Sequence, residues 1–305
     1  MAYGRNEWQL DWLKMNQPQS WYEVWLQSED GFWDSPGVNS TLSQRVNNHG
    51  AVISPVWKTE RSITLERKAD ARNDGDIKTL ALGIKSLCSD PYKLYRLSTK
   101  AEIGEFETEV KLDGPILVDS GQDLHSSINF SIQLVAPEPR IYHSAWQTMT
   151  TGLAQNLDDG LDFSDPGLDF SDPGLSFGES EGSTGFLRLT NNGTAPAPVE
   201  FTLYGPLDHP TITTTVDGQA YTMKYNGELL EGEYVVIKPE ETSGLLQGTA
   251  SRRHLLNPAD FRGSSIPPMP NLLAREPGVL TVGLTHEGPP SATGRIRARW
   301  RSAIW

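Results

Sequence analysis

The stretch from Ser127 to Tyr142 joins a clear strand pattern to a proline-rich stop. Apolar and polar side chains alternate from Ile128 to Leu134, as expected of a β-strand with one buried face. Pro137 and Pro139 follow, and proline lacks the N–H donor that a strand ladder needs. We therefore expect the last strand of one β domain to end here and a stiff hinge to lead into a second. A strand end inside a single large β domain is the alternative that this pattern leaves open.

The length and composition favour two β-rich domains. The chain has 305 residues, which is long for one domain and comfortable for two, and its 28 glycines and 21 prolines indicate many turns. One helical pattern stands out between Asp76 and Cys88, where apolar residues recur at helical spacing and Asp74 or Asp76 can cap the start. Cys88 lies on the apolar stripe of this helix, which predicts a buried structural thiol. The sequence thus predicts an N-terminal domain over residues 1–137 that is mostly β with one packed helix.

The second half predicts a β-sandwich over residues 138–305. Strand-sized runs recur between Phe186 and Ile237 and are separated by turn dipeptides. Three of these dipeptides, which begin at Asn192, Asp217 and Asn226, have asparagine or aspartate followed by glycine, a strong signal for a hairpin.

Residues 158–181 contain an acidic repeat. Gly-Leu-Asp-Phe begins at Gly160 and again at Gly167, with Ser-Asp-Pro-Gly between the copies, and proline in the repeat excludes a coiled coil. The acidic residues could chelate calcium, but their spacing fits neither an EF-hand nor a β-roll. We expect an extended surface loop instead. Four of its carboxylates belong to Asp162, Asp165, Asp169 and Asp172.

The last stretch of the chain alternates arginine with apolar residues. Ile296, Ala298, Trp300 and Ile304 are expected to face inward, and four arginines share the opposite face: Arg295, Arg297, Arg299 and Arg301. Like charges in one row repel each other, so the row predicts a partner that offsets them. We expect a subunit interface in which the row meets an acidic surface, with the 158–181 loop of a neighbouring copy as candidate. A charged edge strand exposed to solvent is the alternative.

Composition and motifs argue against several functional classes. The net charge of −13 disfavours sequence-independent binding to nucleic acid, and the single cysteine excludes an internal disulfide or a cysteine-rich zinc site. No apolar run is long enough to span a membrane, and no signal peptide is visible, so we expect synthesis in the cytoplasm. Nucleophile-elbow, Walker and zinc-protease motifs are missing. The histidines are scattered singly: His49, His125, His143, His209, His254 and His286. The sequence therefore predicts neither catalysis nor a cofactor or metal.

Four stretches resemble the distal tail (Dit) proteins of long-tailed bacteriophages, and most of all the minor tail proteins of actinobacteriophages. The first is the hinge from Phe130 to Tyr142, where the family has an alternating strand followed by Ala-Asp-Pro-Arg and an aromatic residue. Here Glu138 stands in place of the usual aspartate. The other three are residues 190–205, residues 232–268 and the arginine- and tryptophan-rich C-terminus. The acidic repeat resembles an insertion into this pattern.

The resemblance implies a structural virion protein rather than an enzyme. Its N-terminal split barrel would form a hexameric ring at the tail tip, and a galectin-like sandwich would project outward. The ring would join the tail tube protein to the hub and the fibre or receptor-binding proteins, and the tape measure protein and DNA would pass through it. Host synthesis followed by incorporation into the virion is the implied localisation.

Two other functions stay open at this point. Exposed tryptophan or tyrosine faces could stack on sugar rings, which would make the chain a saccharide-binding module that contacts a glycan of the host envelope. A cell-wall hydrolase is the third reading, since fold resemblance alone does not exclude catalysis.

Overall fold

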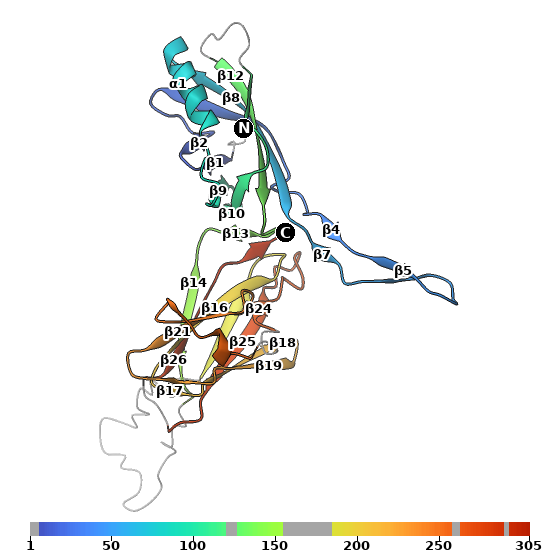
Figure 1. Ribbon diagram of the computed structural model, residues 1–305, viewed down its shortest axis with the longest axis vertical. Helices are drawn as coiled ribbons and strands as arrows, with labels where there is room; N and C mark the ends of the chain where they lie inside the picture. The colour runs from blue at the N-terminus through green and yellow to red at the C-terminus, as the bar shows by residue number, and fades with distance from the viewer. Residues whose placement is uncertain (1–5, 120–126, 155–184, 258–262, 290–292) are drawn as a thin grey trace, which may run out of the picture. The chain divides into compact units, whose positions relative to one another are not determined.

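The computed structural model describes residues 6–119, 127–154, 185–257, 263–289 and 293–305 (Figure 1). Within these ranges the chain is mostly β, and α1 (Asp74–Lys85) is its one α-helix. The chain forms two compact units, residues 1–145 with 303–305 (unit 1) and residues 146–302 (unit 2). Among the described helices, none has the length and apolar character needed to cross a membrane.

Unit 1 is built on one strongly curled antiparallel sheet. Its strand order is β2-β1-β9-β10-β12-β8-β3, with β11 added beside β12 and β13 beside β10. The strands are β1 (Glu7–Leu10), β2 (Leu13–Met15), β3 (Tyr22–Asp30), β8 (Arg61–Ala71), β9 (Tyr95–Ala101), β10 (Gly104–Leu112), β11 (Leu117–Asp119), β12 (Ser127–Ala136) and β13 (Ile141–His143). The predicted alternation of β12 is confirmed, because Ile128, Phe130, Ile132 and Leu134 are all buried.

The sheet of unit 1 curls until its two end strands approach each other. The Asn16 N–H, just after β2, donates to the Val24 carbonyl of β3 at 2.7 Å, and the Leu26 N–H donates to Asn16 Oδ1 at 2.8 Å. No strand ladder joins β2 to β3 in the described part of the chain, so the sheet stays open. This geometry agrees with the split barrel that the family resemblance implied.

The helix α1 covers one face of the curled sheet and begins earlier than the sequence indicated. Its N-cap is Asn73, whose Oδ1 accepts from the N–H groups of Gly75 and Asp76 at 2.9 and 3.0 Å. The prediction of an aspartate cap is therefore wrong. Asn73 lies just before the first turn, where its side chain reaches the free N–H groups, whereas Asp74 and Asp76 lie within it.

Cys88 follows the helix rather than lying on it, because α1 ends at Lys85. The thiol is only 6% exposed, which confirms the predicted burial. Burial, together with the nearby negative charge of Asp11, raises the pKa of Cys88 to about 12. The thiol therefore stays protonated at neutral pH.

Two arginines occupy the buried face of β8, where the sequence pattern shows an otherwise apolar row. Arg67 is fully buried, donates to the carbonyls of Ser28 and Glu66 at 3.0 Å, and has its pKa lowered by burial to about 9. Arg61 is 2% exposed and donates to the main-chain carbonyls of Gly31, just after β3, and of Pro139 in the proline hinge. Burial also lowers the pKa of Arg61, while the charge of Asp34 opposes that shift.

The proline hinge is part of unit 1. The Arg61 Nε–H donates to the Pro139 carbonyl at 3.0 Å, and Ser144 N–H donates to the Glu105 carbonyl at 2.9 Å. β13 pairs with β10, and its other side pairs with β27 (Ala303–Ile304). The units thus divide after residue 145 instead of at 137, and the end of the chain returns to unit 1. The reason is that these hydrogen bonds retain the residues after the prolines.

Unit 2 contains two main antiparallel sheets. One has the order β14-β26-β16-β21-β22-β23, with β24 beside β16, and the other has the order β15-β25-β18-β19. Their apolar residues alternate inward, and the Trp300 indole N–H crosses from one sheet to the Thr190 carbonyl of the other at 2.8 Å. The strands are β14 (Gln147–Gly152), β15 (Phe186–Asn191), β16 (Ala197–Tyr204), β18 (Thr211–Val216), β19 (Gln219–Lys224), β21 (Tyr234–Lys238), β22 (Ser243–Leu246), β23 (Ala250–Ser251), β24 (Ser265–Ile266), β25 (Gly278–Thr285) and β26 (Arg295–Trp300). A short pair, β17 (Leu207–Asp208) with β20 (Glu228–Leu229), and the 3-10 helix η1 (Arg253–Leu255) complete the unit.

Only one of the three predicted hairpin turns joins paired strands. Asp217 and Gly218 connect β18 to β19 with positive φ angles of 48° and 77°, as a tight hairpin requires. The turn after Asn192 instead carries the chain from β15 to β16, which lie in different sheets. The Asn191 side chain holds this crossing by donating to the Ala195 carbonyl at 2.7 Å. Asn226 likewise begins no hairpin, because β19 pairs only with β18 in the described chain.

Candidate functional site

A two-stranded arm leaves the sheet of unit 1 between β3 and β8 (Figure 1). β4 (Val38–Asn39) pairs with β7 (Trp57–Lys58), and further out β5 (Leu42–Gln44) pairs with β6 (Ala51–Ile53). Pro55 lies between β6 and β7 on the returning side of the arm. The arm has no third strand within the described residues, and a lone two-stranded hairpin is marginally stable in water.

The arm exposes an unusual amount of apolar surface. Leu42 and Ile53 lie opposite each other across the two strands and are 68% and 57% exposed, and Trp57 is 70% exposed. The other exposed apolar side chains of the arm are Val38, Val46, Val52 and Val56. Exposed apolar side chains gathered on one element in this number mark an interaction surface more often than a solvated one.

The base of the arm is fixed by Arg61. Its Nη1 donates to the carbonyls of Gly31 and Phe32 at 2.8 and 3.0 Å and also to the Asp34 carbonyl. Its Nε donates to the Pro139 carbonyl of the hinge. One buried guanidinium therefore ties the loop that leads from β3 into the arm to the hinge within unit 1.

The C-terminal arginine row forms on β26 as predicted. Ile296, Ala298 and Trp300 are buried, and Arg295, Arg297 and Arg299 take the opposite face, while Arg301 follows the end of the strand. β26 pairs along its length with β14 on one side and β16 on the other, so the edge-strand alternative is wrong. The inward alternation ends at Trp300, because Ile304 belongs to β27 in unit 1 and is only half-buried.

Two aromatic rings offset part of the charge of the row. The guanidinium of Arg299 lies 3.9 Å from the Trp146 ring centroid, and that of Arg301 lies 4.5 Å from the same ring. Arg295 and Arg297 lie 4.9 and 5.5 Å from the Tyr204 ring. Such contacts stabilise by about 0.5–2 kcal/mol each, depending on exposure.

The acidic half of the predicted interface lies outside the described residues. This holds for Asp162, Asp165, Asp169 and Asp172 and for the whole 158–181 repeat. Among the residues that the structure describes, none of the ion pairs involves Arg295, Arg297 or Arg299, and Glu200 is the carboxylate opposite Arg299 in the strand register. The interface between the row and the acidic loop stays a prediction.

A pocket of about 370 Å³ opens at the Arg295 end of the row. Tyr204 and Tyr234, opposite each other on β16 and β21, stand with ring centroids 5.9 Å apart. The remaining lining residues come from the turns at the ends of these strands and from the start of β26: Gly205, Glu231, Gly232, Glu233, Thr293 and Arg295. Aromatic faces, two carboxylates and a guanidinium thus meet in one small volume.

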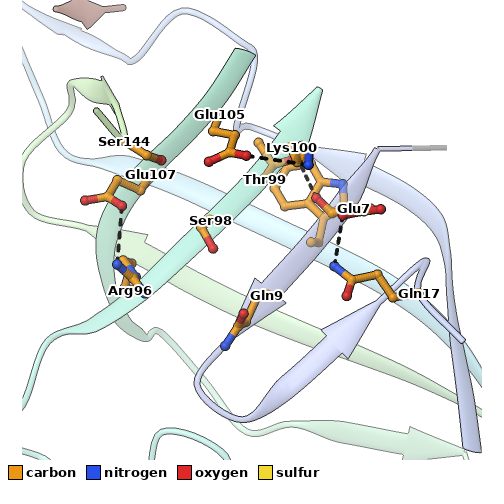
Figure 2. Close-up of a pocket in the computed structure, with 11 residues that line it drawn as sticks. Glu7, Gln9, Gln17, Arg96, Ser98, Thr99, Lys100, Glu105, Glu107 and Ser144 are labelled. Atoms are coloured by element: carbon orange, nitrogen blue, oxygen red, sulfur yellow. Dashed lines mark hydrogen bonds and ion pairs between the residues drawn. The ribbon is translucent and has the colours of Figure 1, made fainter. Parts of the chain in front are cut away.

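A second pocket, of about 220 Å³, lies on the outward face of β1, β9 and β10 in unit 1 (Figure 2). Figure 2 shows that its charged side chains are largely paired with one another: Lys100 with Glu105 at 3.7 Å, and Arg96 with Glu107 at 3.6 Å. The Lys100–Glu105 pair is exposed on both sides, and exposed pairs contribute little to stability. The pocket has the character of a solvated charged sheet face.

The described residues contain no cluster of three histidine, cysteine or acidic side chains that could hold a metal.

Two features of the structure were not predicted from the sequence. Neither the arm nor the pocket beside Tyr204 was predicted. The arm had a signal, because valine, leucine and isoleucine recur between Gly37 and Trp57 without any strand-length run to pair with. The pocket had none, because its residues come from three separated segments.

No family model matches the chain, and no curated protein sequence matches it. The crystal structure of the Dit protein of phage SPP1 superposes with a TM-score of 0.60, covers 99% of this chain and 100% of that chain, and is 9% identical in sequence. This chain has the Dit fold. Two phage P2 baseplate structures in the activated conformation are more distant. The structure with Ca gives a TM-score of 0.46 at 12% identity, and the structure with Sr gives 0.45 at 13%, each covering 97% of this chain and 98% of that chain.

The Dit fold agrees with the family resemblance read from the sequence and with the two-unit architecture. It spans nearly all of both chains. At 9% identity the similarity concerns the fold alone.

Proposed function

We propose that this chain is a structural subunit of a phage tail tip and that copies of it assemble into a ring. The observation that carries this proposal is the apolar arm of unit 1. Its side chains are exposed in the single chain and have no role in its own core, so a second copy of the chain is the simplest partner that buries them. A repeated head-to-tail contact of this kind closes into a ring when its rotation fits.

The fold comparison supports the tail-tip assignment. The SPP1 protein with this fold is described as a paradigm of the hub adsorption apparatus in phages that infect Gram-positive bacteria. By this analogy we place the present chain in the virion, after synthesis in the host cytoplasm. Unit 1 would form the ring, and unit 2, as a galectin-like sandwich, would project from it.

The proposed partners follow from this position. A hexameric ring would contact the tail tube protein on one side and the hub and fibre or receptor-binding proteins on the other. The tape measure protein and DNA would pass through its opening without specific binding, since the chain carries a net charge of −13. We propose that the role is structural, without catalysis or a cofactor.

The arginine row is proposed as a second subunit contact. Arg295, Arg297 and Arg299 lie on the outer face of the interior strand β26, and Arg301 follows the strand directly. We expect an acidic surface of a neighbouring copy to pair with these four guanidinium groups. Reversing Arg297 and Arg299 to glutamate would then weaken assembly, whereas unchanged assembly would discard this contact and leave the arm as the ring contact.

The direct test is the mass of the purified chain in solution together with negative-stain imaging. We expect a closed ring whose mass is six times that of the chain. A chain that stays single at high concentration would overturn the proposal.

A further inference from the structure

The pocket between Tyr204 and Tyr234 is built in a way that a ring subunit does not require. The Gly205 N–H donates to the Glu233 carbonyl at 2.9 Å, and the Leu230 N–H donates to Glu233 Oε2 at the same distance. These bonds fix the wall of the pocket and the position of the Glu233 carboxylate. The wall is tight, since a Cβ on Gly205 would stand only 2.1 Å from the Leu230 carbonyl oxygen.

The tyrosines supply flat faces at a fixed spacing. They form a cross-strand pair with an angle of 39° between the ring planes, and both are half-buried, so each ring is held by its neighbours while part of it stays open. Tyrosine suits such a site because it presents an apolar face and a polar tip together. The Arg295 guanidinium at 4.9 Å from the Tyr204 ring adds donors at the rim.

The polar groups narrow the class of ligand. Glu231 and Glu233 offer carboxylate acceptors, and Arg295 offers several N–H donors, so the pocket can bind a ligand that carries both kinds of hydrogen-bonding group. Two carboxylates disfavour a phosphate or a nucleic-acid backbone in the same volume. An oily ligand would leave the charged groups unpaired.

We propose that this pocket binds one pyranose unit of a saccharide. The C–H face of the sugar ring would stack on a tyrosine, its hydroxyls would donate to Glu231 and Glu233, and Arg295 would donate to a ring or hydroxyl oxygen. The volume of about 370 Å³ lies within the range of small-molecule sites. This binding is a function in addition to ring formation and does not depend on it.

The test uses the full-length chain on an array of immobilised neutral, amino and uronic-acid pyranosides, with inorganic polyphosphate as a polyanion without sugar. We expect the chain to bind at least one pyranoside and not the polyphosphate. Glu231→Gln and Tyr234→Ala should each weaken binding by about tenfold or more. Glu231 is exposed, so its variant folds normally and keeps the test valid even where the tyrosine variant unfolds.

Matched controls are Glu276→Gln and Tyr92→Ala, which change the same residue types at exposed positions away from the pocket. Both controls should bind the array as the unchanged chain does. Binding to none of the pyranosides, binding that survives Glu231→Gln, or binding to polyphosphate alone would each overturn the proposal. A ring seen without any saccharide binding would leave the structural role intact and reject only this site.

Discussion

The arm offers the sharpest test of the proposed ring, through the double variant Leu42→Ser with Ile53→Ser. These two side chains form a cross-strand pair on one face of the arm and are 68% and 57% exposed. Complete burial of a leucine or isoleucine side chain stabilises by about 1.5–3 kcal/mol. Burying the exposed share of each on a neighbour should therefore contribute about 1–2 kcal/mol, or about 2–4 kcal/mol for the pair. Each subunit contact should weaken by about 30- to 1,000-fold in the variant.

The assay is size-exclusion chromatography with light scattering over a range of concentrations, checked by negative-stain imaging. The variant should need a much higher concentration than the unchanged chain to form the ring. Its thermal unfolding should be nearly unchanged, because exposed side chains contribute less than about 0.5 kcal/mol to the fold of the single chain.

Leu273→Ser provides the matched control, since Leu273 is 96% exposed in unit 2, outside the arm. It should assemble as the unchanged chain does. The reasoning is refuted when the double variant forms the same species at the same concentration as the unchanged chain. It is equally refuted when the control loses assembly to the same degree, because the effect would then not be specific to the arm.

Three further predictions concern unit 1. Asn73→Ala should lower the free energy of unfolding in urea by about 1 kcal/mol and Asp74→Ala by less than half of that, since only Asn73 caps α1; equal losses would contradict the assigned cap. Arg61→Ala should lower the free energy of unfolding by about 3 kcal/mol or more, because it leaves buried carbonyls unpaired. A loss below about 1 kcal/mol would contradict this role of Arg61. The pKa of Cys88 is raised from 9.0 to about 12, so the native thiol should react with a maleimide at pH 8 at least about 100-fold more slowly than the thiol of the urea-unfolded chain. The contribution of the protonated thiol to the free energy of unfolding should be lost as the pH rises from about 9 towards 12. Equal labelling rates in the native and unfolded chains would refute the burial.

The strands and their buried faces were largely predictable from local patterns. The alternation at Ile128–Leu134 and at Ile296–Trp300 indicated which side chains face the core, and the structure confirms both. Strand alternation depends on the backbone period of two and needs no knowledge of the partner strand. The Asp217 hairpin was predictable for the same reason, because its two turn residues and its flanking strands are neighbours in sequence.

Predictions that depended on distant residues were less successful. Asn192-Gly193 has hairpin chemistry, yet the strands on either side of it pair with other strands in different sheets. The boundary between the units lies beyond the prolines because Arg61, far earlier in the sequence, binds the Pro139 carbonyl. A row of alternating residues likewise cannot show whether its strand lies at an edge or, as β26 does, between two others.

The sequence by itself determined that this is a turn-rich, mostly β chain in two parts, with one helix, a buried thiol and an arginine face near its end. Tertiary structure alone decided that an apolar hairpin stays uncovered, that Arg61 ties this hairpin to the hinge, and that Tyr204, Tyr234 and Arg295 share a pocket. The physical reason is the distance along the sequence over which each effect acts. Backbone period and turn chemistry act over a few residues, whereas exposure and the gathering of side chains depend on which distant strands pair and on what they leave uncovered.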